Sequence, residues 1–397
     1  MNKTIYFDHA ATTPVKPDVF AAMIPFFTEH YGNPSSIYSI GRENRAAIDE
    51  ARAKVASAIG AKPNEIYFTG CGTEADNWAI KGTAHAYASK GKHIITSAIE
   101  HHAVLHTCAA LEKEGFEVTY VQPDSDGIIH TEDVEKAIRP DTILISIMFA
   151  NNEIGTIQNI PELGALAHSH GILFHTDAVQ ATGALVIDVK EMNIDMLSMS
   201  AHKLYGPKGV GALYVRNGIR PDIFLDGGAQ ERHRRGGTEN VAGIVGFGKA
   251  MELAHKNIEE KAAYIATMRD YLIQSIEEKI PYIKLNGHRS QRLPNNVNFS
   301  FRFIEGEALL LSLDMKGIAA SSGSACTSGS LDPSHVLLAI GLPHEIAHGS
   351  LRLTIGEETT MEEIDYVVGS LVEIVQRLRN MSPLYEQALK ENFQEVK

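Results

Sequence analysis

The 397-residue sequence contains 36 Lys and Arg residues against 49 Asp and Glu residues, which gives a net charge of −13 at pH 7. An acidic chain has no general attraction to nucleic acid or to an anionic membrane surface, so neither is expected as a partner. With 44% hydrophobic and 21% charged residues, the composition is that of a globular protein, and the length predicts about two or three domains.

The three cysteines argue against a disulfide-stabilised secreted protein and favour a reducing compartment. The N-terminal residues lack the apolar core of a signal peptide, and no apolar run reaches the ~18 residues of a membrane-spanning helix. The one local cluster of positive charge, at 232–235, is an exception to the acidic character of the chain, but a solvated loop would have the same composition. We therefore expect a cytoplasmic protein.

Short apolar runs alternate with helical patterns over the first half of the chain. This alternation predicts a mainly parallel, seven-stranded sheet with helices on both faces, and ligands of such folds bind at the carboxyl ends of the strands. The expected strands are residues 65–69, 93–97, 116–121, 142–149, 172–176, 196–200 and 211–215. The expected helices between them are 75–90, 104–114, 131–138 and 160–170.

The pattern changes after about residue 246. A long stretch with regularly spaced charges, 249–279, predicts one connecting helix. A strand at 296–303, a Gly/Ser-rich segment at 321–330 and two further helical stretches follow. These elements predict a second, smaller α/β domain.

Lys203 follows the expected strand 196–200, among small and hydroxyl-bearing residues. A lysine at this place can form a Schiff base with an aldehyde cofactor, and the nearby Ser200 and His202 can hydrogen-bond a phosphate. For a lone lysine, a surface position in a glycine turn is the simpler interpretation.

Asp177 follows the strand 172–176, where its carboxylate can pair with a protonated pyridine nitrogen; a helix N-cap is the alternative. Gly72 and Thr73 lie between a strand and a helix, where backbone N–H groups bind anions, although a plain capping turn would look the same. No nucleotide-binding glycine motif is present. Lysine, aspartate and anion-binding turn together favour pyridoxal phosphate (PLP) as the cofactor.

His101 comes just after the strand 93–97, where an imidazole can stack on a cofactor ring and transfer protons. His102 and His106 stand four residues apart on an expected helix, which is one spacing for zinc ligands. The sequence offers no carboxylate in the usual catalytic place between them, so zinc is the less favoured interpretation.

Cys326 lies within a string of small and hydroxyl-bearing residues, 321–330. Such a segment buries little apolar surface, so we expect an exposed and mobile loop that presents a nucleophilic thiol. Cys71 and Cys108 are expected to be structural. The Arg352 guanidinium can hold a substrate α-carboxylate through two hydrogen bonds, and Asn33 could contribute as well, although a turn role is its default.

These strings together resemble the class V, fold-type I PLP enzymes, and more narrowly the cysteine desulfurases of the NifS/IscS type. The resemblance runs from Tyr6-Phe7-Asp8-His9-Ala10-Ala11-Thr12-Thr13 to Ser382-Pro383-Leu384. It is closest in the strings Glu100-His101, Asn151-Asn152-Glu153-Ile154-Gly155, Ser200-Ala201-His202-Lys203, and 321–328. It implies a large PLP-binding domain at 16–258 and a small domain, carrying the cysteine loop, made of 1–15 and 259–397.

The resemblance also implies roles for individual residues. Lys203 would form the Schiff base and move the Cα proton, and His101 would stack on the ring and handle thiol protons. Asn33, Asn152 and Arg352 would contact the substrate. The residues that would hold the cofactor, besides Lys203 and His101, are Gly72, Thr73, Asn152, Asp177, Gln180, Ser200, His202 and, from the neighbouring subunit of a homodimer, Thr238.

The activity implied is removal of sulfur from L-cysteine, which yields L-alanine and a persulfide on Cys326. The sulfur would pass to an iron–sulfur scaffold protein of the NifU/IscU type, and Cys326 could briefly ligate the partner's cluster. Nitrogen fixation, general cluster assembly and tRNA thiolation are possible destinations. Another PLP reaction, such as transamination, and a catalytically inactive scaffold are the alternative functions; the first leaves the cysteine loop unexplained.

Overall fold

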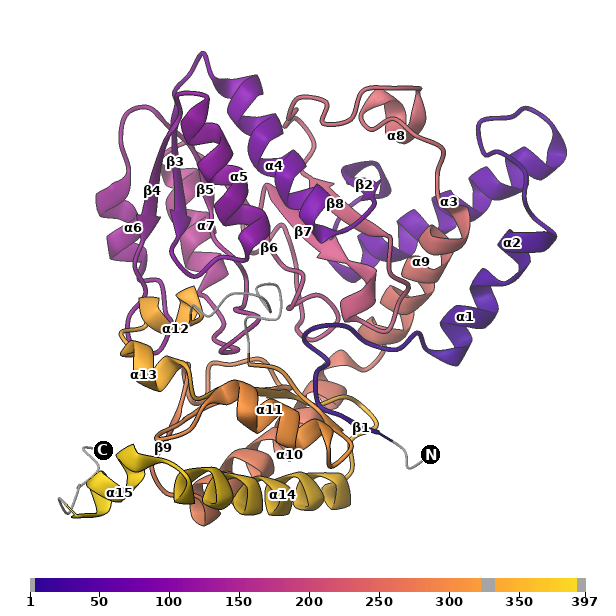
Figure 1. Ribbon diagram of the computed structural model, residues 1–397. Coiled ribbons are helices and arrows are strands. Elements are labelled where there is room, and N and C mark those ends of the chain that lie inside the picture. The colour runs from indigo at the N-terminus through magenta and orange to yellow at the C-terminus, as the bar shows by residue number, and fades with distance from the viewer. Residues whose placement is uncertain (1–3, 323–332, 391–397) are drawn as a thin grey trace.

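The computed structural model describes residues 4–322 and 333–390, and its larger part is built on a seven-stranded sheet (Figure 1). The strand order is β2-β8-β7-β6-β5-β3-β4. All neighbours from β7 to β4 are parallel, and β8 runs antiparallel to both β2 and β7. The strands are β2 (Ile66–Thr69), β3 (His93–Ser97), β4 (Glu117–Val121), β5 (Thr142–Ser146), β6 (Leu173–Asp177), β7 (Met196–Ser200) and β8 (Gly211–Val215).

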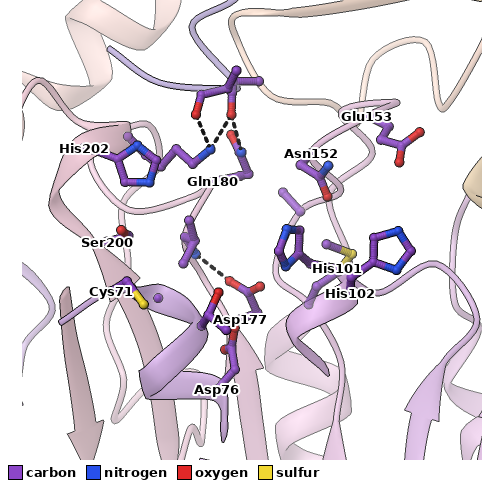
Figure 2. Close-up of a pocket in the computed structure, with 18 of the residues that line it drawn as sticks. Cys71, Asp76, His101, His102, Asn152, Glu153, Asp177, Gln180, Ser200 and His202 are labelled. Carbon is purple, nitrogen blue, oxygen red and sulfur yellow. Dashed lines mark hydrogen bonds between the residues drawn. The ribbon is translucent and has the colours of Figure 1, made fainter. Parts of the chain in front are cut away.

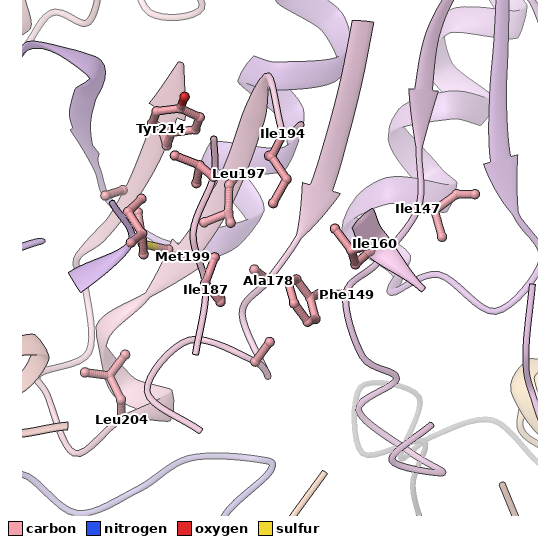
Figure 3. Close-up of a cluster of buried hydrophobic side chains, with 14 of the residues drawn as sticks. Ile147, Phe149, Ile160, Ala178, Ile187, Ile194, Leu197, Met199, Leu204 and Tyr214 are labelled. Atoms are coloured by element: carbon pink, nitrogen blue, oxygen red, sulfur yellow. The ribbon is translucent and has the colours of Figure 1, made fainter. Parts of the chain in front are cut away.

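Successive strand residues point to opposite faces of this sheet, and both faces are buried because helices pack against them. Ile94 and Leu144 pack with α4 and α5, whereas their neighbours Ile95 and Ile145 pack in a second cluster with α3, α7 and α9. Figure 3 shows part of this second cluster around Leu197 of β7. The helices on the two faces are α4 (Gly72–Tyr87) and α5 (His102–Lys113), and α3 (Ser39–Ala58), α6 (Thr131–Ala137), α7 (Ile160–Ser169) and α9 (Val241–His255).

A smaller part with its own apolar core lies below the large sheet in Figure 1. Its antiparallel sheet has the order β12-β10-β9 and packs against three helices. The N-terminal strand β1 pairs in parallel with β11, so the start of the chain joins this part. The elements are β1 (Ile5–Tyr6), β9 (Ile283–Leu285), β10 (Asn296–Phe301), β11 (Ile318–Ala319), β12 (Ser350–Thr354), α10 (Ile258–Lys279), α11 (Gly306–Asp314) and α14 (Met361–Asn380).

Several short elements complete the described chain. They are α1 (Pro17–Met23), α2 (Pro25–Thr28), η1 (Pro63–Glu65), η2 (Ala201–Lys203), α8 (Gln230–His233), α12 (His335–Ala339), α13 (His344–Ala347) and α15 (Pro383–Lys390). Across residues 4–322 and 333–390, no helix combines the length and apolarity needed to cross a bilayer.

The predicted α/β class and the mainly parallel sheet are confirmed, with the seven expected strands in place. The single helix expected over 249–279 is wrong. Lys256 takes an extended conformation and Asn257 a left-handed one, with φ of 55°, so the chain turns between α9 and α10. Asparagine is among the few residues that adopt this conformation readily, and charge spacing alone does not reveal the break. The boundaries at 16 and 259 stay a prediction.

A buried ion pair fixes the segment after β8 to the large sheet. Arg52 of α3 donates two hydrogen bonds to the Glu231 carboxylate, at 2.7 and 2.8 Å, and the backbone N–H of Phe68 donates a third at 3.0 Å. Both charged side chains are about 95% or more buried. A buried charge that loses its partner is strongly destabilising.

We expect Glu231→Gln to lower the free energy of unfolding by about 3 kcal/mol, because the variant leaves the Arg52 charge buried without a counter-charge. Urea denaturation measures the change. Glu277→Gln is the matched control, since its pair with Arg289 is exposed and should contribute about 1 kcal/mol or less. Equal losses in the two variants would contradict the prediction.

Candidate active site

A cavity of about 380 Å³ opens at the carboxyl ends of β5, β6 and β7 (Figure 2). This is the place that a mainly parallel sheet predicts for a ligand. The cavity brings together most of the residues singled out in the sequence. Those that line it are Gly72, Thr73, His101, Asn152, Asp177, Gln180, Ser200, His202, Lys203 and Arg352.

Lys203 reaches the cavity from the 3-10 turn η2, which directly follows β7. Its Nζ donates hydrogen bonds to the carbonyls of Ala10 and Ala11, at 2.6 and 2.8 Å. Gln180 also donates to the Ala10 carbonyl, at 3.0 Å, as the dashed lines in Figure 2 show. The N-terminal segment therefore holds the amine at the cavity wall, where an aldehyde could react with it.

Asp177 is the last residue of β6 and lies on the opposite side of the cavity. One carboxylate oxygen accepts a hydrogen bond from the N–H of Val179 at 2.9 Å. Burial raises the pKa of Asp177 to about 6, while the Val179 N–H and the Lys203 charge oppose the rise. A cation placed beside it, such as a protonated pyridine nitrogen, would favour the charged form further.

The N-terminus of α4 forms the third side of the cavity. Cys71 caps this helix through its Sγ, which accepts from the N–H of Glu74 at 3.4 Å. A Cβ on Gly72 would lie 2.8 Å from a methyl group of Val179, so only glycine keeps this turn open. Ser200 Oγ is buried and has no hydrogen-bond partner among the described residues. An anion bound here would meet the helix dipole and the Ser200 hydroxyl together.

These three sides fit the three ends of PLP. The amine of Lys203 would meet one end, the buried Asp177 carboxylate another, and the helix terminus with the Ser200 hydroxyl the third. The donor set therefore agrees with an aldehyde, a pyridine nitrogen and a phosphate on one small molecule.

His101 caps α5, and its Nδ1 accepts from the N–H of Ala103 at 3.1 Å. In the neutral ring the proton then sits on Nε2. Burial, and secondarily the Lys203 charge, lower the pKa of His101 to about 4. The ring is therefore neutral at pH 7, and its proton-accepting nitrogen is Nδ1, which the N–H of Ala103 occupies in this structure.

Three further histidines cluster beside His101. The ring centroid of His102 lies 4.9 Å from that of His106 and 4.8 Å from that of His335. Within the described parts of the chain, no group of three or more His, Cys, Asp or Glu side chains has the geometry to hold a metal ion. The zinc interpretation therefore gains no support from the described residues.

Arg352 of β12 links the smaller part of the molecule to the cavity. Its Nη1 donates to the carbonyl of Asn152 at 3.0 Å, and its Nη2 donates to the Asp8 carboxylate at 2.8 Å. Its backbone also exchanges hydrogen bonds with Ser321, at the start of the cysteine loop. A guanidinium oriented in this way can share its donors with a substrate carboxylate.

Two predicted site residues stand apart from this cavity, and a third lies outside the described residues. Thr238 is exposed and does not line it. Asn33 is also exposed, and its side chain accepts from the N–H of Ser35 at 2.9 Å, which is a turn role. Cys326 falls in 323–332, outside the described residues.

Sequence reasoning did not single out several residues that the fold brings to the site. Asp8 holds Arg352, and the buried Glu153 accepts from the hydroxyl of Ser334, just after the cysteine loop. Asp76 lines the cavity from α4. Asp8, Glu153 and Asp76 fall inside or beside the motifs quoted from the sequence. Their positions in the sequence do not indicate which residues they contact in the fold.

Comparison with known proteins agrees with this site. Residues 5–367 match the family model for Aminotransferase class-V. A cysteine desulfurase IscS of Methanosarcina thermophila is 62% identical over 383 residues, which cover 96% of this chain and 95% of the relative. A cysteine desulfurase IscS of Clostridium botulinum is 59% identical over 392 residues, 98% of this chain and 99% of the relative. A solved structure of a NifS-like protein superposes with a TM-score of 0.89 at 39% identity, covering 94% of this chain and 100% of that structure.

The cavity and these matches define a PLP-dependent enzyme of fold-type I. The chain belongs to the class V aminotransferase family and, within it, to the cysteine desulfurases of the IscS and NifS type. The predicted fold class, enzyme class and cofactor are confirmed.

We expect Gly72→Ala to weaken PLP binding by about 10-fold, because the added methyl group must displace the Val179 side chain and overpacking costs about 1–3 kcal/mol. Equilibrium titration of the apoenzyme with PLP, followed by visible absorbance, measures the affinity. Gly369→Ala in α14 is the control, since a Cβ there meets nothing within 4 Å. Unchanged affinity in Gly72→Ala would contradict the tight-turn explanation.

Proposed function

We propose that this chain removes the sulfur atom of L-cysteine, releases L-alanine and carries the sulfur as a persulfide on Cys326. The observation that carries the proposal is the single cavity that gathers Lys203, Asp177 and the Gly72–Thr73 turn, beside the two anchors of the cysteine loop. The names of the similar proteins give the substrate class.

PLP, when bound, supplies a ring that withdraws electrons from the substrate Cα. Asp177 would sit against the ring nitrogen, with Gln180 and Asn152 beside the ring and His101 stacked over it. The phosphate would lie at the N-terminus of α4. The groups that hold it would be Gly72, Thr73, Ser200 and His202.

Lys203 would move the Cα proton. Its Nζ already lies at the cavity wall, held by two backbone carbonyls that keep it within reach of the substrate. Neutral His101 would accept the proton of the substrate thiol at Nδ1, after this nitrogen releases the N–H of Ala103. Arg352 would bind the α-carboxylate with Asn152 nearby, and Asn33 would contribute only if its loop reaches the substrate.

The Cys326 thiolate would then attack the substrate sulfur. An S–S bond forms, the C–S bond breaks, and its electron pair stays on the carbon, which is protonated and leaves as alanine. Both ends of the loop are fastened beside the cavity: Ser350 donates to the carbonyl of Ser322, and Ser334 donates to Glu153. These anchors support delivery of the thiol to the cavity.

A homodimer is the second part of the proposal. Large apolar side chains are exposed on α1, α2 and the loop after them, at one edge of the molecule in Figure 1. Such a patch is typical of a protein–protein interface. Thr238, which is exposed and away from its own cavity, would reach the phosphate of the neighbouring subunit. The exposed residues are Phe20, Ile24, Phe27, Tyr31, Ile37 and Tyr38.

The persulfide sulfur would pass to an iron–sulfur scaffold protein of the NifU/IscU type in the cytoplasm, where Cys326 could briefly ligate the acceptor's cluster. The free thiols of Cys71 and Cys108 are consistent with a reducing compartment. The net charge of −13 gives no reason to expect nucleic acid or membrane as a partner.

We expect Cys326→Ala to abolish persulfide formation and to lower alanine production from L-cysteine at least about 100-fold, while PLP stays bound. Alanine and protein-bound sulfur are both measured. Cys108→Ala is the control, because that thiol is buried in α5 and its pKa is raised to about 12 by burial, so it is a poor nucleophile. Normal sulfur delivery by the Cys326 variant would overturn its role.

The pH dependence tests His101. Since its pKa is lowered to about 4, the proton-accepting form persists at all higher pH and is lost only as the pH falls through about 4. In a plot of kcat/KM against pH, we expect the fall in activity due to His101 protonation to lie near pH 4. This fall should be absent in His101→Gln, and kcat/KM of that variant at pH 8 should be about 100-fold lower than that of the wild type. A His101-dependent fall near pH 6.5 would contradict this.

A further inference from the structure

Asp76, Glu100 and Asp177 are three of the carboxyl groups buried at or near the cavity, and the proposed reaction uses only Asp177 of these three. The exposed fractions of Asp76, Glu100 and Asp177 are 1%, 0% and 6%. Asp76 comes from the first turns of α4, and its side chain lies close below that of Asp177 in Figure 2. Asp177 and Glu100 both act electrostatically on Asp76, and interacting carboxyl groups in a buried site disfavour one another's negative charge.

Asp177 has the partners that favour a negative charge. The backbone N–H of Val179 donates to it, and the Lys203 ammonium acts on it from across the cavity. Both interactions favour the ionised form of the carboxyl group, which burial disfavours. The negative charge of the site therefore belongs on Asp177.

Among the described residues, Asp76 has a hydrogen bond with Ser198 but no cationic partner comparable with Lys203. Within residues 4–322 and 333–390, its Oδ1 is buried without a hydrogen-bond partner, and the nearest basic nitrogen, His175 Nε2, is 3.8 Å away. The two ring nitrogens of His175 are taken up by the hydroxyls of Ser146 and Ser198, at 2.8 and 3.0 Å. Burial lowers the pKa of His175 to about 3, so this ring offers Asp76 no positive charge at pH 7.

The other titratable groups facing Asp76 act in the same direction. Asp177 on β6 and Glu100 after β3 both disfavour a charge on it, and burial is the largest effect; together they raise the pKa of Asp76 well above its ordinary value. Hydrogen bonding by Ser198 opposes the rise. Burial also raises the pKa of Glu100 to about 8, so Glu100 holds its own proton at pH 7.

We propose that Asp76 is a positioning residue that keeps its proton at neutral pH, so that Asp177 carries the one carboxylate charge beneath the cofactor ring. The inference rests on the proposed pairing of Asp177 with the ring nitrogen. A second charge at Asp76 would drive protonation of Asp177 and remove the acceptor that the ring nitrogen needs. A neutral Asp76 thus allows Asp177 to stay ionised and to pair with a protonated ring nitrogen, which keeps the ring electron-withdrawing.

Infrared spectroscopy of the PLP-loaded wild-type enzyme tests the proton directly. At pH 7 we expect a carbonyl band of a protonated carboxylic acid that shifts when aspartate is labelled with ¹³C at its carboxyl carbon. This band should be missing in Asp76→Asn. It should be retained in Glu100→Gln, because the carboxyl band of Glu100 does not respond to the aspartate label. A wild-type spectrum without the aspartate band would overturn the proposal, even if every variant failed to fold.

Cofactor binding gives the second readout. Asp76→Asn replaces a neutral acid with a neutral amide of the same shape, so the PLP dissociation constant and the pH midpoint of the visible band should change by less than about twofold and about 0.3 pH units. A tenfold change in affinity would show that a charge had been removed. Asp177→Asn should weaken PLP binding at least about tenfold. If it does not, the proposed role of Asp177 fails while the infrared result on Asp76 still stands.

Discussion

The site is organised by a constraint on charge: a buried carboxylate, Asp177, must keep its negative charge at a cavity that Lys203 lines from the neighbouring strand. Burial would discharge an isolated carboxylate, and the raised pKa of Asp177 shows that tendency. Lys203 opposes it, and a cationic ring nitrogen would do so more directly. The sheet provides this geometry because β6 and β7 are parallel neighbours that end at the same edge, where Asp177 and the turn carrying Lys203 emerge.

The smaller part of the molecule completes the site rather than merely adjoining it. Arg352 of β12 contacts Asp8 near the N-terminus and Asn152 of the large part, so three distant segments meet at one guanidinium. Ser321 and Ser334 bound the cysteine loop and are fastened to Arg352 and Glu153. The residue proposed to bind the substrate carboxylate therefore also holds one end of the cysteine loop. This arrangement suits a reaction in which an enzyme thiol must attack a bound substrate.

Burial explains the protonation states of the site more than any single contact does. His101 and His175 are neutral because water is excluded from their rings. Asp76 and Glu100 favour their protonated forms for the same reason, with the sign reversed for an acid. With these groups neutral, Asp177, Lys203 and Arg352 are the charges of the cavity to which the proposed reaction gives a role, and they act where the cofactor and substrate would bind.

The sequence by itself determined the strands, the order of the motifs and the identity of the lysine, aspartate and glycine turn, because apolar periodicity and turn residues act over a few neighbours. It also predicted that these motifs share one sheet edge. The break between α9 and α10 at Asn257 was not predicted, because a left-handed backbone conformation does not change the spacing of charged residues along the sequence. Only the tertiary structure decided that Asp8 orients Arg352, that Glu153 fastens Ser334 and that Asp76 lies beneath Asp177. Those contacts join residues from separate elements, and their energies come from burial and pairing that exist only once the chain has folded.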